Sequence, residues 1–319
     1  MMYAVENCVE VRARGRFVTV PAVDIGGRTV IARGKRLRIA TVRSEEMLER
    51  ELENPDLYIN ALKDGANQKL KAHIFSFVQK LPATQPKYPY RMEWESVAAI
   101  QLVSSKLWWE ALPQETRKNV RRSQRRGVAV KMRELDGALI QDIRGVNNES
   151  PLRQGRRNAY YGKSFEETKK LYGEFVGRCD FICAYFGEEL IGFLHLVYRG
   201  EVASILNLTT KARHFDKRPA NALVAKAVEL CEARQISYVT YGLYNYGNKR
   251  DSPLREFKIR NGFEEILVPR FFVPLTAWGA VCLKLKLHRG LIGILPSSVI
   301  SLVVDLRSKW YRFCSAPPV

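Results

Sequence analysis

Apolar and polar residues alternate along much of the first third of the chain, as they do in strands that bury one face. The Gly26-Gly27 pair lies between two such segments and is a turn signal, so it predicts a hairpin. The strands that we expect here are 9–20, 28–42, 74–81 and 90–102, and the acidic segment 44–54 is expected as a helix because Ser44 can cap it.

From residue 128 onward the pattern becomes regular. The elements that it predicts are, in order, a strand at 128–135, helices at 137–149 and 164–178, three strands within 180–210, a helix at 220–235, a strand at 237–244, a helix at 252–262 and a strand at 264–276. Consecutive strands with short turns indicate an antiparallel meander, and strands that alternate with helices indicate parallel pairing. We therefore predict a mixed α/β sheet with helices on both faces.

The segment SPLREFKIRNGF spans residues 252–263 and predicts a helix at 252–262. This helix carries a lysine beside its apolar face. Ser252 can cap its start, Pro253 suits its first position and Gly262 can end it. Phe257 lies on the apolar face, and Lys258 lies at its edge. Such a lysine either extends to solvent over its own stem or serves a site.

Charge adds a constraint on partners. The chain has 319 residues with 52 Lys and Arg against 33 Asp and Glu, which gives a formal net charge of +19. This excess favours anionic partners such as phosphates, nucleic acid or a membrane surface. Six scattered cysteines form no CxxC pair, and the four histidines do not cluster with them, so we expect no metal site and a reducing, cytoplasmic compartment.

Two segments concentrate the basic residues. One is a predicted helix that ends before Gly127 and contains Arg117, Lys118, Arg121, Arg122, Arg125 and Arg126. It can bind tRNA phosphates, bind anionic lipid head groups, or remain a solvated face. The other is the tail, 277–319, where apolar stretches are flanked by cations against the single acid Asp305. The tail is interpreted either as helices on the inner face of a membrane or as helices packed on the domain.

The element order, together with NALVAKAVE, SPLREFKIRNGF and VPRFFVPL, resembles the GNAT acyltransferase superfamily, and within it the FemAB-like branch. That branch carries two GNAT-like halves. The resemblance therefore implies a shortened N-terminal half at 1–118, an acyltransferase domain at 119–276 and basic amphipathic helices at 277–319. It also implies transfer of an acyl group, from acyl-CoA or aminoacyl-tRNA, to an amine or hydroxyl acceptor such as a cell-envelope saccharide or a peptidoglycan precursor.

Two alternatives remain open beside this function. One is an ordinary acetyl-CoA-dependent N-acetyltransferase, and the other is a non-catalytic adaptor that binds membrane or RNA. The acetyl-CoA enzymes carry Q/R-x-x-G-x-G/A, whose glycines let backbone N–H groups surround a pyrophosphate. The matching stretch here is FDKRPA, in which Arg218 replaces the first glycine. The resemblance implies that the donor is bound by Thr209, Arg213, Lys217, Arg218, Ala220 and Asn221, although Asn221 alone reads as a plain helix cap.

The resemblance also places the chemistry. Lys258 stands where many acetyltransferases have a tyrosine that protonates the leaving thiolate. The resemblance implies that Lys258 is an electrostatic anchor at the mouth of the donor cleft. The strands 202–210 and 237–244 are expected to splay apart, so that an amide near Asn207 polarises the acyl carbonyl. The expected catalytic residues are Lys258, Asn207 and Tyr244, and the expected acceptor-binding residues are Asn245, Lys249, Arg250 and Arg270.

Overall fold

The computed structural model describes residues 8–13, 16–47, 51–153, 156–245 and 252–290. Within these residues the chain forms two compact units: unit 1 comprises 8–96 and 267–290, and unit 2 comprises 97–266. The units therefore change at 96/97 and at 266/267. The three-part division at 118/119 and 276/277 stays a prediction.

Unit 1 is built on a sheet with the strand order β1-β2-β3-β4-β5-β14. Its strands are β1 (Cys8–Ala13), β2 (Arg16–Ile25), β3 (Arg28–Arg33), β4 (Ile39–Val42), β5 (Ile74–Val78) and most of β14 (Glu264–Pro274). The chain crosses between the units within β6 (Arg91–Gln101) and near the start of β14. The predicted hairpin is confirmed: Gly26 and Gly27 join β2 to β3 with φ of +58° and +75°, values that glycine adopts without strain.

The prediction of a helix at 44–54 is wrong. The described part of that segment contains only a 3₁₀ turn, η1 (Glu45–Met47), and the α-helix begins later, as α1 (Pro55–Ala61). Asn54 caps α1 by accepting the Leu57 N–H at 3.2 Å, and Glu45 turns inward to accept the Val78 N–H at 2.7 Å. The sequence analysis also did not predict η2 (Leu62–Ala66) and α2 (Asn67–Leu70), which follow α1 directly.

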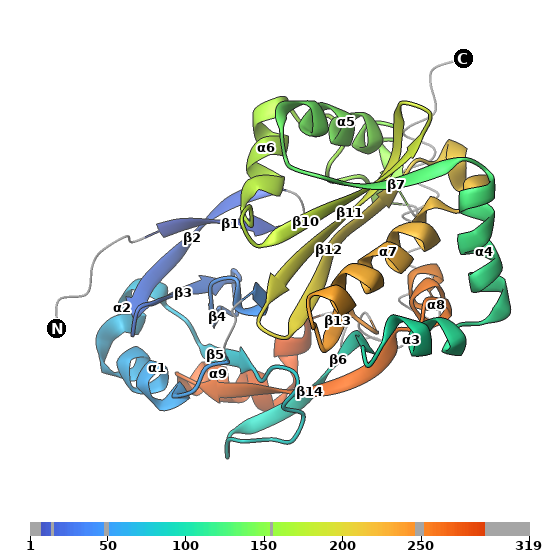
Figure 1. Cartoon of the computed structure of the whole chain (residues 1–319). Helices are drawn as coiled ribbons and strands as arrows, with labels where there is room; N and C mark the ends of the chain where they lie inside the picture. Colours follow the sequence, from blue (N-terminus) through green and yellow to red (C-terminus); the bar gives the residue numbers. More distant parts are fainter. Residues whose placement is uncertain (1–7, 14–15, 48–50, 154–155, 246–251, 291–319) are drawn as a thin grey trace. The chain divides into compact units, whose positions relative to one another are not determined.

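Unit 2 has the strand order β7-β10-β11-β12-β13-β6. Its strands are β7 (Val128–Arg133), β10 (Cys179–Phe186), β11 (Glu189–Arg199), β12 (Val202–Thr210) and β13 (Tyr238–Leu243), and the short pair β8 (Leu152–Arg153) and β9 (Arg156–Arg157) lies outside this sheet. The first four strands are antiparallel, β12 and β13 are parallel, and β6 is antiparallel to β13 (Figure 1). The predicted meander followed by a parallel pair is thus confirmed.

Helices cover both faces of the unit 2 sheet (Figure 1). The helices α5 (Gly137–Asn147) and α6 (Phe165–Gly173) lie on one face, and α7 (Pro219–Ala233) lies on the other, where α4 (Gln114–Arg125) packs against it. The remaining helical elements of the unit are α3 (Ser105–Ala111), η3 (Ala212–Lys217) and α8 (Pro253–Arg260). The predicted α/β class with helices on both faces is confirmed.

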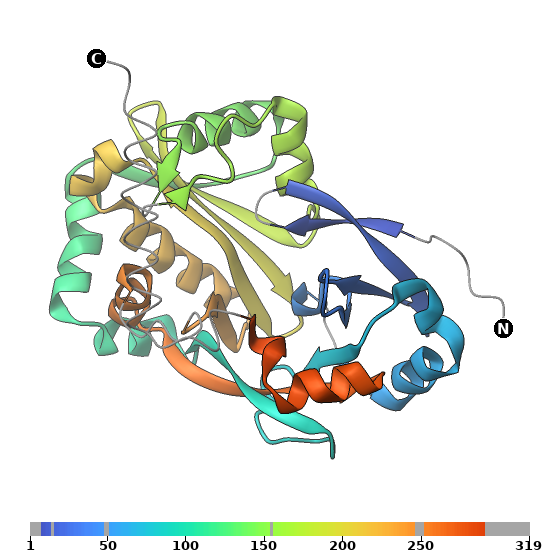
Figure 2. The ribbon, with the colours of Figure 1, turned by 180° about the vertical axis from the view of Figure 1, so that it is seen from behind.

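The tail begins as an ordinary packed helix in unit 1. In α9 (Ala277–Lys284) and η4 (Leu287–Arg289), Cys282 and Leu283 are buried against Ile74 and Phe272 (orange-red in Figure 2). Residues 291–319, which carry the rest of the predicted amphipathic tail, lie outside the described residues. None of the helices that the structure describes is long and apolar enough to cross a bilayer.

Candidate functional site

The two parallel strands in the middle of unit 2 pair over only part of their length. The β12–β13 register runs through Val202–Tyr238, Ala203–Val239 and Ser204–Thr240 and then stops. β12 continues to Thr210 along β11, and β13 continues to Leu243. The prediction that these strands part is therefore confirmed for their paired backbone, and the backbone groups of β12 beyond Ser204 are not used by β13.

A bulge in β12 sets which of its side chains face each side. β11 pairs His195 with Asn207 but Leu196 with Ile205, so Leu206 is the extra residue. Ala203 and Ile205 belong to the core cluster shared with α7, and Leu208 packs against that same cluster. Asn207 therefore takes the opposite face. The sequence could not fix this face, because an uninterrupted alternation would have put Asn207 with Ala203 and Ile205.

The opposite face carries two of the predicted site residues. Asn207 and Thr209 are both buried, and the Asn207 amide donates to the Tyr160 hydroxyl at 3.2 Å. Tyr160 lies in the segment before α6 and contacts the Tyr172 ring of that helix. Asn207 therefore faces the side of the sheet that carries α5 and α6.

Lys258 does not extend to solvent. Its side chain is completely buried, its Nζ donates to the Leu243 carbonyl at 2.6 Å, and Nζ lies 4.8 Å from the centre of the Tyr241 ring. Burial lowers the pKa of Lys258 to about 8, because an ammonium loses hydration inside the protein. Leu243 and Tyr241 both lie beyond Thr240, where β13 has left β12. The structure thus brings Lys258 to the separated part of these strands, inside the domain.

The end of α8 is held by a network that the sequence analysis missed. The Asn261 side chain donates to the Phe257 carbonyl at 2.7 Å and accepts from the Asn221 amide at 3.0 Å. The Asn261 carbonyl accepts from Trp108 Nε1 at 3.1 Å. Asn221 is therefore no helix cap: the N-cap of α7 is Arg218, and Asn221 joins α7 to α8. The AN pair of the α7 motif and the NG pair after α8 were the available signals.

The segment between β12 and α7 holds a residue other than glycine in the left-handed conformation. Arg218, at the position of the first motif glycine, has φ +55° and ψ +40°, the left-handed conformation that glycine adopts readily. Pro219 follows it as the first residue of α7, and the Ala220 position is half-buried. An arginine therefore holds a backbone conformation that usually favours glycine.

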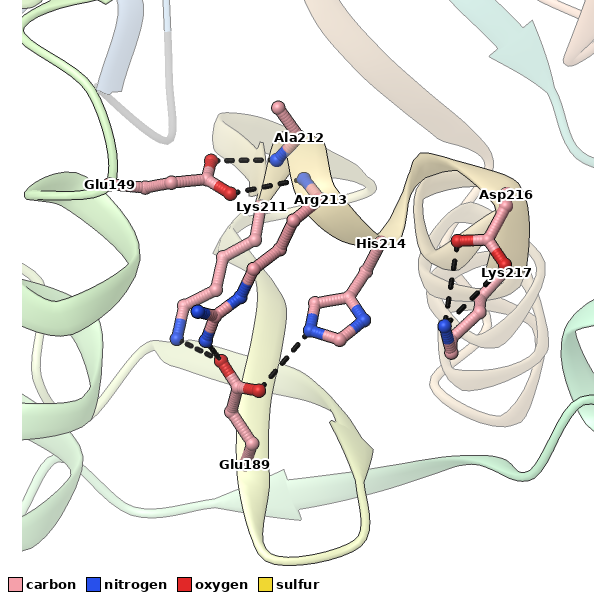
Figure 3. Close-up of polar contacts among 8 residues, drawn as sticks. All are labelled: Glu149, Glu189, Lys211, Ala212, Arg213, His214, Asp216 and Lys217. Carbon is pink, nitrogen blue, oxygen red and sulfur yellow. Dashed lines mark hydrogen bonds and ion pairs between the residues drawn. The ribbon is translucent and has the colours of Figure 1, made fainter.

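Acidic side chains of the chain itself already occupy much of this segment (Figure 3). The Glu149 carboxylate accepts the backbone N–H groups of Ala212 at 2.6 Å and of Arg213 at 3.1 Å. The Glu189 carboxylate binds the side chains of Lys211, Arg213 and His214. Burial raises the pKa of Glu189, but hydrogen bonds from these three side chains outweigh it and lower the pKa to about 2.

A third carboxylate completes this arrangement. Asp216 pairs with Lys217 at 3.4 Å (Figure 3) and with Arg126 of the segment after α4 at 2.8 Å. Two of the predicted phosphate ligands, Arg213 and Lys217, are therefore each bound to an acid. Arg218 is exposed and forms no ion pair with any residue that the structure describes.

Two further predicted site residues, Tyr244 and Asn245, follow β13 directly and contact other residues of unit 2. Tyr244 is buried under the Arg255 guanidinium, 5.0 Å from its ring centre, and the Asn245 amide donates to Glu265 at 2.7 Å. Lys249 and Arg250 lie outside the described residues.

Arg270 belongs to unit 1, in an internal ion-pair cluster with Glu45 at 3.1 Å and Glu95 at 2.5 Å. Burial alone would lower the pKa of Arg270, but the two carboxylates raise it. Its described contacts are those of a structural cation, and they show no substrate role.

The basic helix α4 turns its cations outward. Thr116, Val120 and Ser123 are buried, and the Thr116 hydroxyl donates to the Arg260 carbonyl at 2.8 Å. Lys118 and Arg125 are exposed and form no ion pair within the described part of the chain. The outer face of α4 is therefore a row of largely uncompensated charge in unit 2.

No family model and no curated protein matches this sequence. Solved structures do match. L-PGS from Bacillus licheniformis has a TM-score of 0.55 at 13% identity over 86% of this chain and 89% of that one. The C-terminal domain of a putative lysylphosphatidylglycerol synthetase from Agrobacterium fabrum has a TM-score of 0.53 at 13% identity, over 87% of this chain and 90% of that one. FemX has a TM-score of 0.52 at 11% identity, over 82% of this chain and 88% of that one. The FemAB-like fold is thereby confirmed across most of the chain.

Proposed function

We propose that the chain is an acyltransferase of FemAB-like GNAT type that transfers an acyl or aminoacyl group to an amine or hydroxyl acceptor. The observation that carries this proposal is the position of Lys258. A fully buried ammonium reaches the backbone of β13 where that strand has separated from β12. Burying a lysine is costly, so a lysine at this place needs a purpose that a leucine would not serve. The fold shared with FemX and L-PGS supports the same conclusion.

In the proposed reaction the acceptor nitrogen or oxygen attacks the acyl carbonyl carbon directly. The new bond forms as the carbonyl oxygen becomes an oxyanion, and collapse of this intermediate breaks the bond to the donor oxygen or sulfur. The acceptor loses one proton and the leaving group gains one, so the transfer balances. Lys258 supplies positive charge to the oxyanion or the leaving group, and N–H groups of β12 around Asn207 supply hydrogen bonds.

The β12–α7 segment favours aminoacyl-tRNA over acyl-CoA as the donor. A coenzyme A pyrophosphate binds to free backbone N–H groups, and those of Ala212 and Arg213, just before the FDKRPA stretch, are already accepted by Glu149. Arg213 is also bound to Glu189, and Lys217 is bound to Asp216. A diphosphate would have to displace these carboxylates, whereas tRNA can present its phosphates elsewhere.

The outer face of α4 is the proposed place for those phosphates. Its exposed Lys118 and Arg125 form no ion pair with a described residue, and Arg121 lies against the Trp109 ring at 5.6 Å. Neutralising phosphates with such a row releases counterions, so tRNA binding should weaken steeply with salt. The charge-reducing variant Lys118→Gln/Arg125→Gln should bind tRNA more weakly and with a smaller salt slope. Lys69→Gln/Lys169→Gln, which removes two exposed lysines from α2 and α6, is the matched control.

For the acceptor, the similar structures point to the cell envelope. FemX and a lysylphosphatidylglycerol synthetase domain are among them, so an amine of a peptidoglycan precursor and a hydroxyl of an anionic phospholipid are the acceptor classes to test first. Incubation of the protein with a mixture of aminoacyl-tRNAs carrying labelled amino acids and with each acceptor class, followed by mass spectrometry, identifies the product.

The decisive variant is Lys258→Met, which keeps the length of the side chain and removes its charge. We expect transfer to fall by about two to three orders of magnitude, as for loss of one oxyanion donor, while the circular dichroism spectrum is unchanged. Lys169→Met on the exposed face of α6 is the control. Full transfer activity in Lys258→Met would refute the catalytic role of Lys258. No transfer by the wild-type chain with any donor and acceptor class would leave the non-catalytic adaptor as the better function.

One observation favours the second candidate, an acetyl-CoA-dependent N-acetyltransferase. Arg218, at the position of the first glycine of the coenzyme A motif, adopts a left-handed conformation that favours glycine. The two donors separate in one experiment: thermal-shift titration with acetyl-CoA and gel-shift titration with aminoacyl-tRNA. Stabilisation by acetyl-CoA without tRNA binding would replace the first proposal by the second.

A further inference from the structure

One side of α9 is apolar and faces solvent. Trp278 is 48% exposed, Val281 45% and Leu285 60%. Their spacing of three and four residues puts them on one side of the helix, and Leu285 is its C-cap residue. We call these three residues the α9 stripe. Large apolar side chains that gather on one exposed face are typical of an interaction surface.

The opposite side of α9 already has its partner. Cys282 and Leu283 are buried against β5 and β14. Gly279 lies so close to β5 that a Cβ at this position would stand 1.9 Å from the His73 carbonyl oxygen. This close approach fixes the rotation of α9 within unit 1. The α9 stripe therefore faces outward because the other side of the helix is committed to the core.

Among the described residues, no acid pairs with the cations beside the α9 stripe, whereas those further along do have an acidic partner. Lys284 and Lys286 are exposed and form no ion pair with a residue that the structure describes. His288 and Arg289 both bind Glu93, at 2.9 Å and 3.0 Å. The stripe is thus bordered by two uncompensated lysines, in a chain whose formal net charge is +19.

We propose that the α9 stripe is a docking surface for the head-group region of a bilayer that contains anionic lipid. Tryptophan and leucine enter the boundary between head groups and acyl chains, and lysines beside them bind anionic head groups. This inference goes beyond the proposed acyl transfer, because it concerns where the protein binds and not what it catalyses.

Charge argues against the two other occupants of the stripe. The chain's own segment 291–319 carries Arg307, Lys309 and Arg312 against the single acid Asp305, so it has the same sign as the lysines beside the stripe. A second copy of the chain would bring its own Lys284 and Lys286 to the contact. An anionic bilayer complements both the apolar residues and the lysines.

The test is co-sedimentation of the full chain with vesicles of phosphatidylcholine and phosphatidylglycerol, and with vesicles of phosphatidylcholine alone. We expect binding to the anionic vesicles and a loss of about tenfold or more in Trp278→Ser/Leu285→Ser, because burial of both side chains supplies much of the binding. Val103→Ser/Val176→Ser is the control, since these two side chains are 77% and 63% exposed in unit 2. Unchanged vesicle binding by the stripe variant would overturn the proposal, because charge elsewhere would then explain all binding.

Two further measurements separate the other occupants. The thermal midpoint and the mass by light scattering are compared between wild type and Trp278→Ser/Leu285→Ser, without vesicles. We expect both to be unchanged. A fall of several degrees in the midpoint would show that the chain itself covers the stripe, and loss of a dimer would show that a second copy does. Either result overturns the bilayer proposal, and neither depends on acyltransferase activity.

Discussion

Asn221 at the start of α7 donates from its side-chain amide to the Asn261 side-chain oxygen just after α8, at 3.0 Å. This single hydrogen bond ties the helix that follows β12 to the helix that carries Lys258. Asn261 in turn holds the last turn of α8 through the Phe257 carbonyl. We therefore expect Asn221 to act as a positioning residue for Lys258, through Asn261 and the last turn of α8.

The first prediction concerns this hydrogen bond. Asn221→Ala should lower the free energy of unfolding by about 1 kcal/mol, because the Asn261 oxygen loses its partner. It should also lower kcat more than it raises KM, and shift the basic limb of the pH–rate profile, because Lys258 is less well placed. Lys226→Ala, on the same helix, is the control. A stability loss with an unchanged pH–rate profile would reduce Asn221 to a purely structural residue.

The second prediction concerns pH. The folded-state pKa of Lys258 is lowered to about 8 from 10.5, so the unfolded chain holds one more proton between these values. Stability should therefore rise with pH from about 8 to 10.5 relative to Lys258→Met, by at most about 3 kcal/mol. Acyl transfer, which uses the ammonium, should fall over the same rise. Chemical denaturation and rates measured from pH 7 to 10.5 check both, and a parallel stability curve in Lys258→Met would contradict the assignment.

The third prediction isolates a steric contact. Gly262 has φ +80°, and a Cβ on it would stand 2.8 Å from Trp108 Nε1. Gly162 has φ +71° and open space around it. Gly162→Ala should cost about 1 kcal/mol for the backbone alone, and Gly262→Ala about 1–3 kcal/mol more, because Trp108 must move from Asn261. Urea denaturation of both variants gives the difference, and equal losses would mean that Trp108 yields freely.

The fourth prediction concerns the left-handed arginine. Arg218 has φ +55°, where every residue with a Cβ is strained. Arg218→Gly should therefore be more stable than Arg218→Ala by about 1 kcal/mol, although glycine is the more flexible residue in the unfolded chain. Thermal unfolding of the pair measures this. Greater stability of the alanine variant would show that position 218 leaves the left-handed region in solution.

The order of elements in unit 2 could be predicted because its strands and helices are each long and strongly patterned. The helix expected at 44–54 was wrong because two local competitors intervene: Asn54-Pro55 starts a new helix, and Glu45 is drawn inward to the Val78 N–H. The sequence carries no sign of the second effect, since Val78 lies 33 residues further along.

The candidate site divides in the same way. The position of Lys258 on α8 and the parting of β12 from β13 followed from the family resemblance. The burial of Lys258 did not, because a lysine at the edge of an apolar face usually reaches water. Nor did the acidic partners of Arg213, since Glu149 and Glu189 come from distant segments that only the fold brings together.

The extra residue in β12 has a consequence for how this part of the chain can vary. Leu206 shifts the alternation of side chains between the two faces of β12 by one residue. Its deletion would exchange the faces of the side chains from Asn207 to Thr210, so that Asn207 would point into the apolar cluster under α7. Individual residues of the strand can therefore be replaced by others of similar size and polarity, but the number of residues in the strand cannot change. Insertions and deletions at Leu206 should therefore be far rarer among homologues of this chain than substitutions.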